Sequence, residues 1–380
     1  MRTLLHKAPK GTVVYFPVSP ESKYIELITT AIPDRYSIEF LQGSSIESLL
    51  KRRQRGEALL LHVHWEEFAF FRCDSDAAAN AKAQALARQL ERFKRAGGRI
   101  VWTIHNGVPH RMPYLQAFLQ LRTKLAQIAH IILVHNQASI EFLCAQVGVD
   151  TGRLRVLPHP SYLGSYELEE ATIPRLLHSD ATRTILGFGT LRDQKGFVRM
   201  IDMLPPDFLR ERQATIRIVG KGREADVMRL TSMRRQDVVV DLGYAPDSEV
   251  PELLRSAACI VLPYRQFLTS GIAHLAMTFG AITVAPRVSQ FEEITPGTAK
   301  ALLFTADDPD DFRRAIDAAL ALTPAERLEI ATALMQRAKT LHPRKISADL
   351  LKIYDTMAIG AAPGWLERRL RALLRRFVGR

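Results

Sequence analysis

Short apolar runs alternate with segments of helical period along most of the chain, and this alternation predicts its secondary structure. In the first half, apolar runs predict strands at residues 12–18, 58–65, 99–104 and 130–135. Amphipathic periodicity predicts helices at residues 19–32, 77–96 and 112–129, and another that ends at Val147. The run at residues 58–65 is of the kind that a parallel sheet buries on both faces. Strands separated by helices in this way predict a parallel, doubly wound sheet.

The pattern breaks at residues 157–180, where Pro158, Pro160 and Pro174 stand among several acidic residues, and this stretch is expected to be a linker. The alternation then restarts. It predicts strands at residues 184–188, 215–219, 238–241, 259–263 and 282–285. It predicts closing helices at residues 310–322, 324–341 and 347–357. The second half therefore predicts a sheet of the same kind as the first.

The expected fold class is α/β, with two Rossmann-like, doubly wound domains that face one another across a cleft. A length of 380 residues suits two domains. Their expected bounds are residues 1–160 and 161–342, followed by residues 343–380 with helices and a basic tail. Ligands in such sheets bind beyond the carboxyl ends of the strands, so the polar residues found there are the candidates for a site.

The composition is that of a globular, intracellular protein. Hydrophobic residues make up 47% of the chain and charged residues 24%, which excludes a disordered chain. Cys73, Cys144 and Cys259 are scattered without metal-like spacing, so free thiols in a reducing compartment are expected. The N-terminus lacks the apolar core of a signal peptide, and no apolar run is long enough to span a membrane.

The net charge of +12 requires an acidic partner, and its location helps to choose one. Residues 363–380 alone contain six arginines and one glutamate. Within residues 365–380, apolar side chains fall on one helical face and arginines on the other, which predicts an amphipathic helix lying on an anionic membrane surface. A helix packed on its own domain with a solvated basic face is the alternative. Nucleic acid is not favoured, because no recognised module or aromatic-interleaved basic strand is present.

A glycine-containing loop follows the first predicted strand of the second half. Gly187 and Gly189 end the strand, and Arg192 and Lys195 follow within one short loop. Glycines let the backbone approach a ligand closely, and two cations near a helix start can bind a diphosphate. The alternative is an ordinary turn with a solvated basic helix start.

Two further loops in the second half could bind a nucleotide or a sugar. Gly220 and Gly222 fit the dinucleotide fingerprint with Asp241 further on, so a nicotinamide enzyme is one possibility. The mid-chain position of this loop favours contact with some other nucleotide ligand. Ser270 and Gly271 begin a helix whose free N–H groups suit a sugar or a phosphate, with a simple N-cap as the alternative.

Polar side chains also gather at two strand ends of the first half. One group is His62, His64, Trp65, Glu66 and Glu67, and the other is His105, Asn106 and His110. Histidine with carboxylate at strand ends can perform general acid–base chemistry. Zinc is a rival interpretation, but a supporting cysteine or aspartate pattern is missing. One of the two strand histidines is expected to be a core residue, and His135 and His159 are weaker candidates.

The order of these loops resembles the GT-B glycosyltransferases of the group 1 type. The resemblance covers residues 180–300 and rests on the loops at Gly187–Gly196, Val219–Gly222, Leu242–Tyr244 and Pro263–Gly280. Residues 62–65, 101–106, 188–189, 262–264 and 270–271 most resemble bacterial exopolysaccharide enzymes such as the GDP-mannose:glycolipid 4-beta-mannosyltransferases. In such a fold the first domain faces the acceptor, the second binds the nucleotide sugar, and the C-terminal helices return to the first domain.

The resemblance implies a role for each matching residue. Arg192 and Lys195 would hold the donor diphosphate, the residues near Gly243 would contact the nucleoside, and the Ser270–Gly271 helix start would meet the sugar or its phosphate. His105 would face the sugar from the first domain. The expected donor-binding residues are Gly189, Arg192, Lys195, Gly222, Gly243, Tyr244, Tyr264, Ser270 and Gly271. The expected acceptor-side residues are His64, Trp65, Asn106 and His110.

Two positions depart from the family pattern. Phe267 and Leu275 occupy the places of the paired glutamates of the retaining enzymes, and Pro17, Ser19 and Pro20 replace a glycine-rich loop after the first strand. The stereochemical outcome is therefore left open. The resemblance implies that no bound metal is needed, in keeping with the absence of an Asp-x-Asp pair from either cleft-facing cluster. No cofactor is expected beyond the nucleotide-sugar substrate.

The resulting expectation is a cytoplasmic glycosyltransferase associated with the inner face of the membrane. It would move a hexose, mannose or glucose, from a GDP- or UDP-linked donor to a lipid-linked or polysaccharide acceptor in exopolysaccharide or cell-surface glycan synthesis. Glu66 is the first candidate for the catalytic base, followed by Glu67 and His105. A nucleotide-sugar epimerase on the same fold and a non-catalytic sugar- or nucleotide-binding protein are the alternatives.

Overall fold

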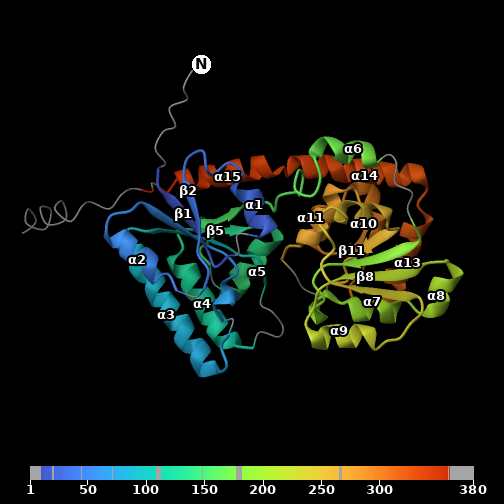
Figure 1. Cartoon of the computed structure of the whole chain (residues 1–380), viewed down its shortest axis with the longest axis horizontal. Coiled ribbons are helices and arrows are strands. Elements are labelled where there is room, and N and C mark those ends of the chain that lie inside the picture. Colours follow the sequence, from blue (N-terminus) through green and yellow to red (C-terminus); the bar gives the residue numbers. More distant parts are fainter. Residues whose placement is uncertain are drawn as a thin grey trace, which may run out of the picture. The chain divides into compact units, whose positions relative to one another are not determined.

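The computed structural model describes residues 10–18, 21–43, 45–70, 72–107, 113–147, 149–176, 182–264, 268–357 and 359. The chain divides into two compact units (Figure 1). The first consists of Met1–Pro158 with Arg344–Arg380, and the second of His159–Pro343. Each unit contains a six-stranded parallel sheet with helices, which confirms the predicted α/β, doubly wound class.

The sheet of the first unit has the strand order β2-β1-β3-β4-β5-β6. Its strands are β1 (Thr12–Phe16), β2 (Ser37–Phe40), β3 (Leu59–Val63), β4 (Arg99–Thr103), β5 (Ile131–Val134) and β6 (Leu154–Val156). Its helices are α1 (Lys23–Thr29), α2 (Glu47–Gln54), α3 (Asp76–Arg95), α4 (Leu115–Ile128) and α5 (Ala138–Val147), with the 3-10 turns η1 (Glu66–Phe70) and η2 (Thr151–Arg153). The last helix of the described residues, α15 (Pro343–Asp355), places Tyr354 and Ser347 against this unit.

The sheet of the second unit has the order β12-β11-β10-β7-β8-β9. Its strands are β7 (Thr184–Phe188), β8 (Thr215–Gly220), β9 (Val238–Leu242), β10 (Cys259–Val261), β11 (Thr283–Pro286) and β12 (Leu303–Phe304). Its longer helices are α6 (Glu169–Leu176), α7 (Phe197–Met203), α9 (Glu224–Thr231), α10 (Val250–Ser256), α11 (Gly271–Thr278), α13 (Pro309–Ala321) and α14 (Pro324–Thr340). Shorter elements are α8 (Pro206–Glu211), α12 (Ser289–Glu292), η3 (Asp193–Lys195) and η4 (Gly297–Leu302).

Each sheet changes its direction of growth at one point. In the first unit, β1 and β3 are neighbours although β2 follows β1 on the other side. In the second unit, β7 and β10 are neighbours, because the chain runs outward through β8 and β9 before it returns. At such a point the connections after the two strands leave in opposite directions, which opens a crevice at their carboxyl ends.

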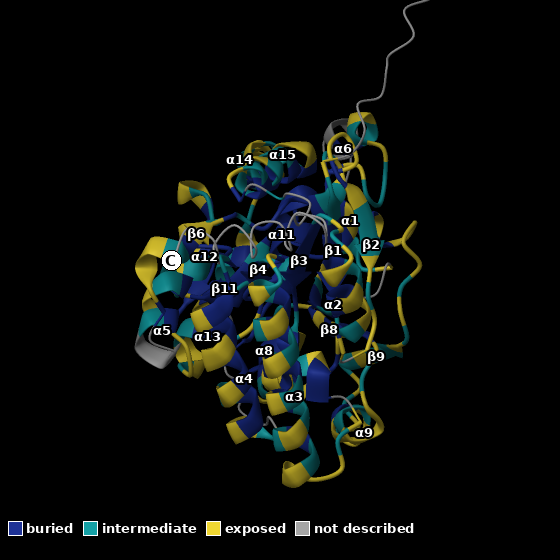
Figure 2. Ribbon diagram, turned by 90° about the vertical axis from the view of Figure 1, so that its left-hand side faces the viewer, coloured by how far each residue is buried: buried dark blue, intermediate teal, exposed yellow. Residues whose placement is uncertain are grey.

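The inner strands are largely buried, the edge strands β2 and β9 are partly exposed, and the helices expose their outer faces (Figure 2). All five residues of β3 are buried, as the continuous apolar run predicted. The largest fully buried side chains include Trp102 and, unexpectedly, the charged Arg122. None of the helices in the described ranges is long and apolar enough to cross a membrane.

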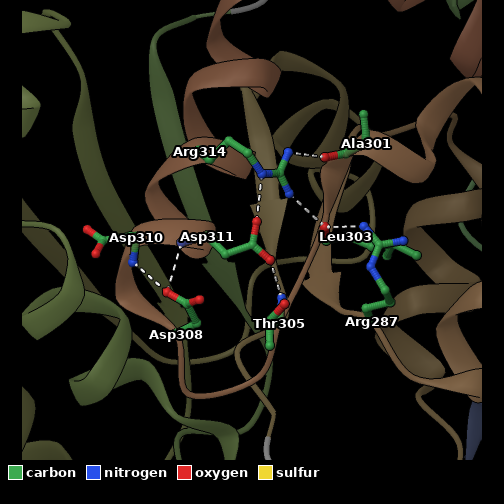
Figure 3. Close-up of polar contacts among 8 residues, drawn as sticks. All are labelled: Arg287, Ala301, Leu303, Thr305, Asp308, Asp310, Asp311 and Arg314. Carbon is green, nitrogen blue, oxygen red and sulfur yellow. Dashed lines mark hydrogen bonds and ion pairs between the residues drawn. The ribbon is translucent and has the colours of Figure 1, made fainter.

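A polar network fixes the start of α13 (Figure 3). The Asp308 carboxylate accepts hydrogen bonds from the backbone N–H groups of Asp310 and Asp311, both at 3.0 Å, and so caps the helix. The Asp311 carboxylate accepts from the Thr305 N–H, and this bond and Arg314 hold the pKa of Asp311 down at about 2. Arg314 also donates to the carbonyl of Leu303, which ties α13 to the end of β12.

The structure corrects the prediction of a linker at residues 157–180. His159, Ser161 and Tyr162 are buried in the second unit, and α6 follows them. The Ser161 N–H donates to the Leu341 carbonyl, and the Tyr162 N–H donates to the Thr278 hydroxyl, at 2.8 and 2.9 Å. The segment that contains the prolines is therefore irregular but packed. Its backbone N–H groups donate to Thr278 of α11 and to Leu341, the residue that follows α14.

Candidate functional site

Two cations and an aromatic ring follow the carboxyl ends of β7 and β10. The ammonium of Lys195, at the end of η3, lies 3.9 Å from the ring centroid of Tyr264, which follows β10 and is buried. This is a cation–π contact, which holds the ammonium without neutralising it. Arg192 begins the same turn and is exposed. Among the described residues, neither Arg192 nor Lys195 forms an ion pair with a carboxylate.

Glycines hold the loops of this edge against one another. A Cβ on Gly220 would overlap the carbonyl oxygen of Gly189, and one on Gly222 would overlap that of Leu191. The loops are joined by backbone hydrogen bonds, from Gly189 N–H to the Val219 carbonyl and from Leu191 N–H to the Lys221 carbonyl. The glycines thus act mainly in packing loop on loop. By fixing the loops, they set the positions from which the Arg192 and Lys195 side chains extend. The sequence alone could not tell this packing role of the glycines from direct contact with a ligand.

The predicted nucleoside residues lie further along the same edge. The Gly243 N–H donates to the Gly220 carbonyl, and the Tyr244 ring is 80% exposed with the Lys221 ammonium 5.4 Å from its centroid. Gly243 and Tyr244 line an open pocket of ≈ 510 Å³, which Asp241 and Glu252 also border. The Asp241 carboxylate is paired with Arg217, which also borders the pocket, and the Glu252 carboxylate can accept hydrogen bonds from hydroxyl or amino groups.

Ser270 caps α11 as predicted. Its hydroxyl accepts from the Ala273 N–H at 3.2 Å, and its carbonyl accepts from the ring of His274 at 2.9 Å. The first turn of α11 borders the glycine loop, because a Cβ on Gly189 would contact Ile272 at 3.3 Å. The structure therefore brings all the expected donor-binding residues to adjoining loops of one unit.

In the first unit, the structure corrects the assignment of Glu66 as the catalytic base. Glu66 is only 2% exposed and forms an ion pair with Arg122, which is 1% exposed. One carboxylate oxygen accepts from Arg122 at 2.7 Å, and the other accepts from the Trp102 indole at 3.1 Å. A carboxylate with both oxygens occupied by buried partners is a structural group rather than a base. The sequence did not predict this ion pair, because Arg122 lies in the middle of α4 and no nearby motif marks it.

Glu67 has the properties that Glu66 lacks. It accepts a hydrogen bond from the exposed Asn106 amide at 2.6 Å. Burial, and then the neighbouring Glu66 carboxylate, raise the pKa of Glu67 to about 7. A carboxyl group with such a pKa can exchange a proton near neutral pH. Of the three candidate bases, Glu67 is the one whose environment suits proton transfer.

His62, His64, His105 and His135 form a buried cluster in the first unit. His135 Nδ1 lies 2.9 Å from the Leu157 carbonyl and so must carry a proton, because a carbonyl can only accept. His105 Nδ1 lies 3.5 Å from the opposite nitrogen of His135, and His64 Nδ1 lies 2.8 Å from His105 Nε2. Burial, and then the neighbouring histidines, lower the pKa values of His64 and His105 well below the usual value. His64 and His105 are therefore neutral at pH 7.

This cluster corrects two expectations. Both nitrogens of His105 face other histidines, and Trp65 stacks on its ring at 4.3 Å, so His105 is a core residue and does not suit a base. His64 is fully buried and does not present itself to an acceptor. His62 is a core residue too, bonded to Thr103 and to Tyr354, far away in sequence. Of the expected acceptor-side residues that the structure describes, the half-buried Trp65 and the exposed Asn106 have accessible side chains.

Other predicted positions fall outside what is described or find no support. His110, Phe267 and residues 365–380 lie outside the described residues. Among the residues that are described, no cluster of histidine, cysteine or carboxylate side chains could hold a metal ion. Residues that the sequence did not single out, Arg122, Tyr162, His274 and Tyr354, pack directly against candidate residues. Three of them lie within helices and Tyr162 lies in the irregular segment before α6, so no strand-end pattern in the sequence marks them.

Comparison with known proteins defines the class. Residues 182–321 match the family described as "Glycosyl transferases group 1". Solved structures with the same fold are Anabaena Alr3699/HepE in complex with UDP and glucose (TM-score 0.65, 14% identity, 91% of this chain and 99% of that one) and the sucrose-phosphate synthase of Thermosynechococcus elongatus (TM-score 0.68, 13% identity, 91% and 98%). The chain is a glycosyltransferase with the GT-B fold, and residues 182–321 are its group 1 domain.

Among curated proteins, the chain is similar to the GDP-mannose:glycolipid 4-beta-D-mannosyltransferase of Xanthomonas campestris pv. campestris. The identity is 26% over 303 residues, which cover 76% of this chain and 79% of that protein. A second sequence of the same description is 25% identical over the same length. The predicted resemblance to such enzymes is confirmed.

Separating Glu66 from Arg122 should destabilise the first unit. Arg122→Met leaves a buried carboxylate without its cation, and we expect a loss of about 3–5 kcal/mol in the free energy of unfolding. The double variant Arg122→Met with Glu66→Leu removes both charges and should recover most of that loss. Urea unfolding followed by circular dichroism measures both. A stable single variant, or a double variant no better than the single one, would contradict the structural role of this pair.

Proposed function

We propose that the chain transfers a hexose from a nucleoside-diphosphate sugar to a lipid-linked or polysaccharide acceptor. The observation that carries this proposal is the position of Lys195, held over the Tyr264 ring at the carboxyl ends of β7 and β10. With Arg192, it offers positive charge that no carboxylate neutralises among the described residues. A diphosphate leaving group develops negative charge as the sugar departs, and fixed cations stabilise that charge without a metal ion.

The neighbouring features support the same ligand. The pocket lined by Gly243 and Tyr244 has room and hydrogen-bond acceptors for a nucleoside. The first turn of α11 offers backbone N–H groups beside the glycine loop. Relatives agree in chemistry, since one is described as a GDP-mannose-dependent transferase to a glycolipid and another was solved with UDP and glucose. We assign the donor to the class of GDP- or UDP-linked hexoses and place the product in cell-surface glycan or exopolysaccharide synthesis.

Loss of the Lys195 charge should impair turnover far more than folding. We expect Lys195→Ala to lower kcat/KM by about 10²–10³-fold, the usual effect of removing one charge-stabilising group. The assay measures nucleoside diphosphate released from GDP- and UDP-hexoses with a lipid-linked glycan acceptor. Lys300→Ala, at an exposed lysine of η4, is the matched control and should stay near wild type. Undiminished turnover of Lys195→Ala with the productive donor would refute the phosphate role.

Glu67 is the proposed base that takes the proton from the acceptor hydroxyl. The base acts when deprotonated, so activity should rise as pH increases through the pKa of about 7 and level off above it. Glu67→Gln keeps the hydrogen bond with Asn106 possible but cannot accept a proton, and kcat should fall by about 10²–10⁴-fold. The pH profile of kcat is the measurement. An unchanged profile in Glu67→Gln would assign the base elsewhere.

Residues 365–380 are proposed to bind an anionic membrane surface, on their sequence pattern alone. We expect deletion of residues 363–380 to abolish sedimentation with phosphatidylglycerol vesicles, while the full chain binds them and ignores neutral phosphatidylcholine vesicles. Replacing the tail arginines with glutamine tests the charge separately and should weaken binding strongly. Continued sedimentation of the shortened chain would remove the tail from this role.

A further inference from the structure

The sheet of the first unit begins at an edge that carries cationic side chains, and the proposed function uses none of them. Arg99 is the first residue of β4, His130 precedes β5, and Arg153 precedes β6. Lys94 lies in the last turn of α3. Because β4, β5 and β6 are parallel neighbours, their first residues share one edge of the sheet. The candidate catalytic and acceptor-side residues of this unit follow the opposite edge, where the strands end.

The His130 ring supplies one hydrogen-bond donor at this edge. Its Nδ1 lies 3.1 Å from the backbone nitrogen of Ile100, which can only donate, so Nδ1 is the acceptor of the ring. Burial, and then the charges of Lys94 and Arg99, lower the pKa of His130 to about 4, so the ring is neutral at pH 7. A neutral ring that accepts at Nδ1 carries its single proton on Nε2, and this N–H group is free to donate.

The Arg99 guanidinium is a second donor at the same place. Its Nη1 lies 3.4 Å from Nε2 of His130. Both nitrogens carry hydrogen, so neither can accept from the other. Among the described residues, no oxygen accepts a hydrogen bond from either group. Two donors that meet in this way can share the oxygen of one ligand, most strongly if that oxygen is negatively charged.

Lys94 and Arg153 add positive charge beside these donors. Burial, and then the charges of Arg153 and Arg99, lower the pKa of Lys94. The Arg153 guanidinium is held in place, because its Nη1 donates to the carbonyls of Gln127 and Ala129, both at 3.0 Å. The three cations therefore lie close enough to repel one another, and an anion bound among them would relieve that repulsion.

The charge of the group is only partly balanced within the protein. The Asp150 carboxylate lies 3.4 Å from Nε of Arg153 and also accepts from the Gly152 N–H at 3.0 Å. In the part of the chain that is described, neither Lys94 nor Arg99 forms an ion pair with a carboxylate. The three cations therefore exceed the neighbouring carboxylate by two charges, which matches the charge of a phosphate dianion.

The kinds of donor also favour phosphate over carboxylate. The donors come from the end of α3 and from the starts of three strands, so they reach a ligand from several elements. A carboxylate offers two oxygens in one plane, whereas a phosphate group offers a tetrahedral set that several donors can approach at once. Guanidinium and ammonium groups are the side chains that most often bind phosphate in proteins.

We propose that the cationic group at the starting edge of the first sheet binds a phosphate group. Its members are Lys94, Arg99, His130 and Arg153. The phosphate belongs either to a soluble phosphate ester or to the headgroup of a phospholipid, because both present the same oxygens. The site is separate from the proposed sugar transfer, since none of its members takes part in donor binding or in the chemistry.

Calorimetry of the full chain with glycerol 3-phosphate tests this inference. Lys94→Gln and Arg99→Gln each remove one charge from a half-buried position, and each should weaken binding about 10-fold. His130→Asn keeps an oxygen that can accept from the Ile100 N–H but removes the Nε2 donor, and it should weaken binding by a similar factor. Arg88→Gln, at an exposed arginine of α3, is the matched control and should bind like the wild type.

Two further measurements show where the phosphate binds. Binding of glycerol 3-phosphate should persist in Lys195→Ala, because that lysine belongs to the proposed donor site of the second unit. The pKa of His130 should rise from about 4 when the ligand binds, because an anion beside Nε2 favours the protonated ring. Nuclear magnetic resonance of histidine labelled with carbon-13 measures this rise. Binding that is lost in Lys195→Ala but kept in Arg99→Gln, or a His130 pKa that the ligand does not change, would overturn the inference.

Titration with phosphatidic acid vesicles identifies the source of the phosphate. The double variant Lys94→Gln with Arg99→Gln keeps residues 365–380 intact, so it isolates the contribution of this site. Weaker vesicle binding by the double variant assigns the site to a lipid headgroup. Unchanged vesicle binding, together with lost binding of glycerol 3-phosphate, assigns it to a soluble ester. Failure of the wild type to bind glycerol 3-phosphate, or binding of both probes that the double variant retains in full, would overturn the inference and leave the proposed function as it stands.

Discussion

The second unit depends on a cation that is held in place but not neutralised. At the point where β7 and β10 lie side by side, Lys195 rests on the Tyr264 ring rather than on a carboxylate. A salt bridge there would hold the lysine equally well but would cancel the charge that a phosphate requires. An aromatic face attracts the ammonium through its quadrupole and leaves the net charge intact. The glycine loops also leave the charge of the lysine intact. Their backbones pack against one another, and glycine has no side chain that could add a competing anion.

Much of this arrangement could be predicted because it follows from local pattern and from sheet geometry. A parallel strand that ends in glycine and is followed by cations predicts a ligand-binding loop. The strand order of the sheet then brings such loops together. The residues from Gly189 to Lys195 and the Ser270 cap were therefore within reach of sequence reasoning. The edge strands β2, β6 and β12 were not, because two to four residues carry too little periodicity to be recognised.

The first unit shows what local pattern cannot reveal. Glu66 and Glu67 are adjacent and alike in sequence, yet one is buried against Arg122, 56 residues away, and the other meets an exposed amide. His62 bonds with Tyr354, which is 292 residues away. Such pairs decide whether a titratable group is structural or reactive, because a buried partner removes both its exposure and its freedom to exchange protons. No spacing within one segment records a partner on another.

The division of the chain has a consequence for the order in which the protein can assemble during synthesis. The second unit is an uninterrupted segment, His159–Pro343, inserted between the two parts of the first. Tyr354 and Asp355 complete the first unit through bonds to Tyr15, Tyr36 and Lys10. Ribosomes deliver Tyr354 and Asp355 after all of His159–Pro343, so the inserted segment has its whole sequence available while the first unit still lacks α15. Lys10, Tyr15 and Tyr36 are translated before the inserted segment but obtain these partners only after it.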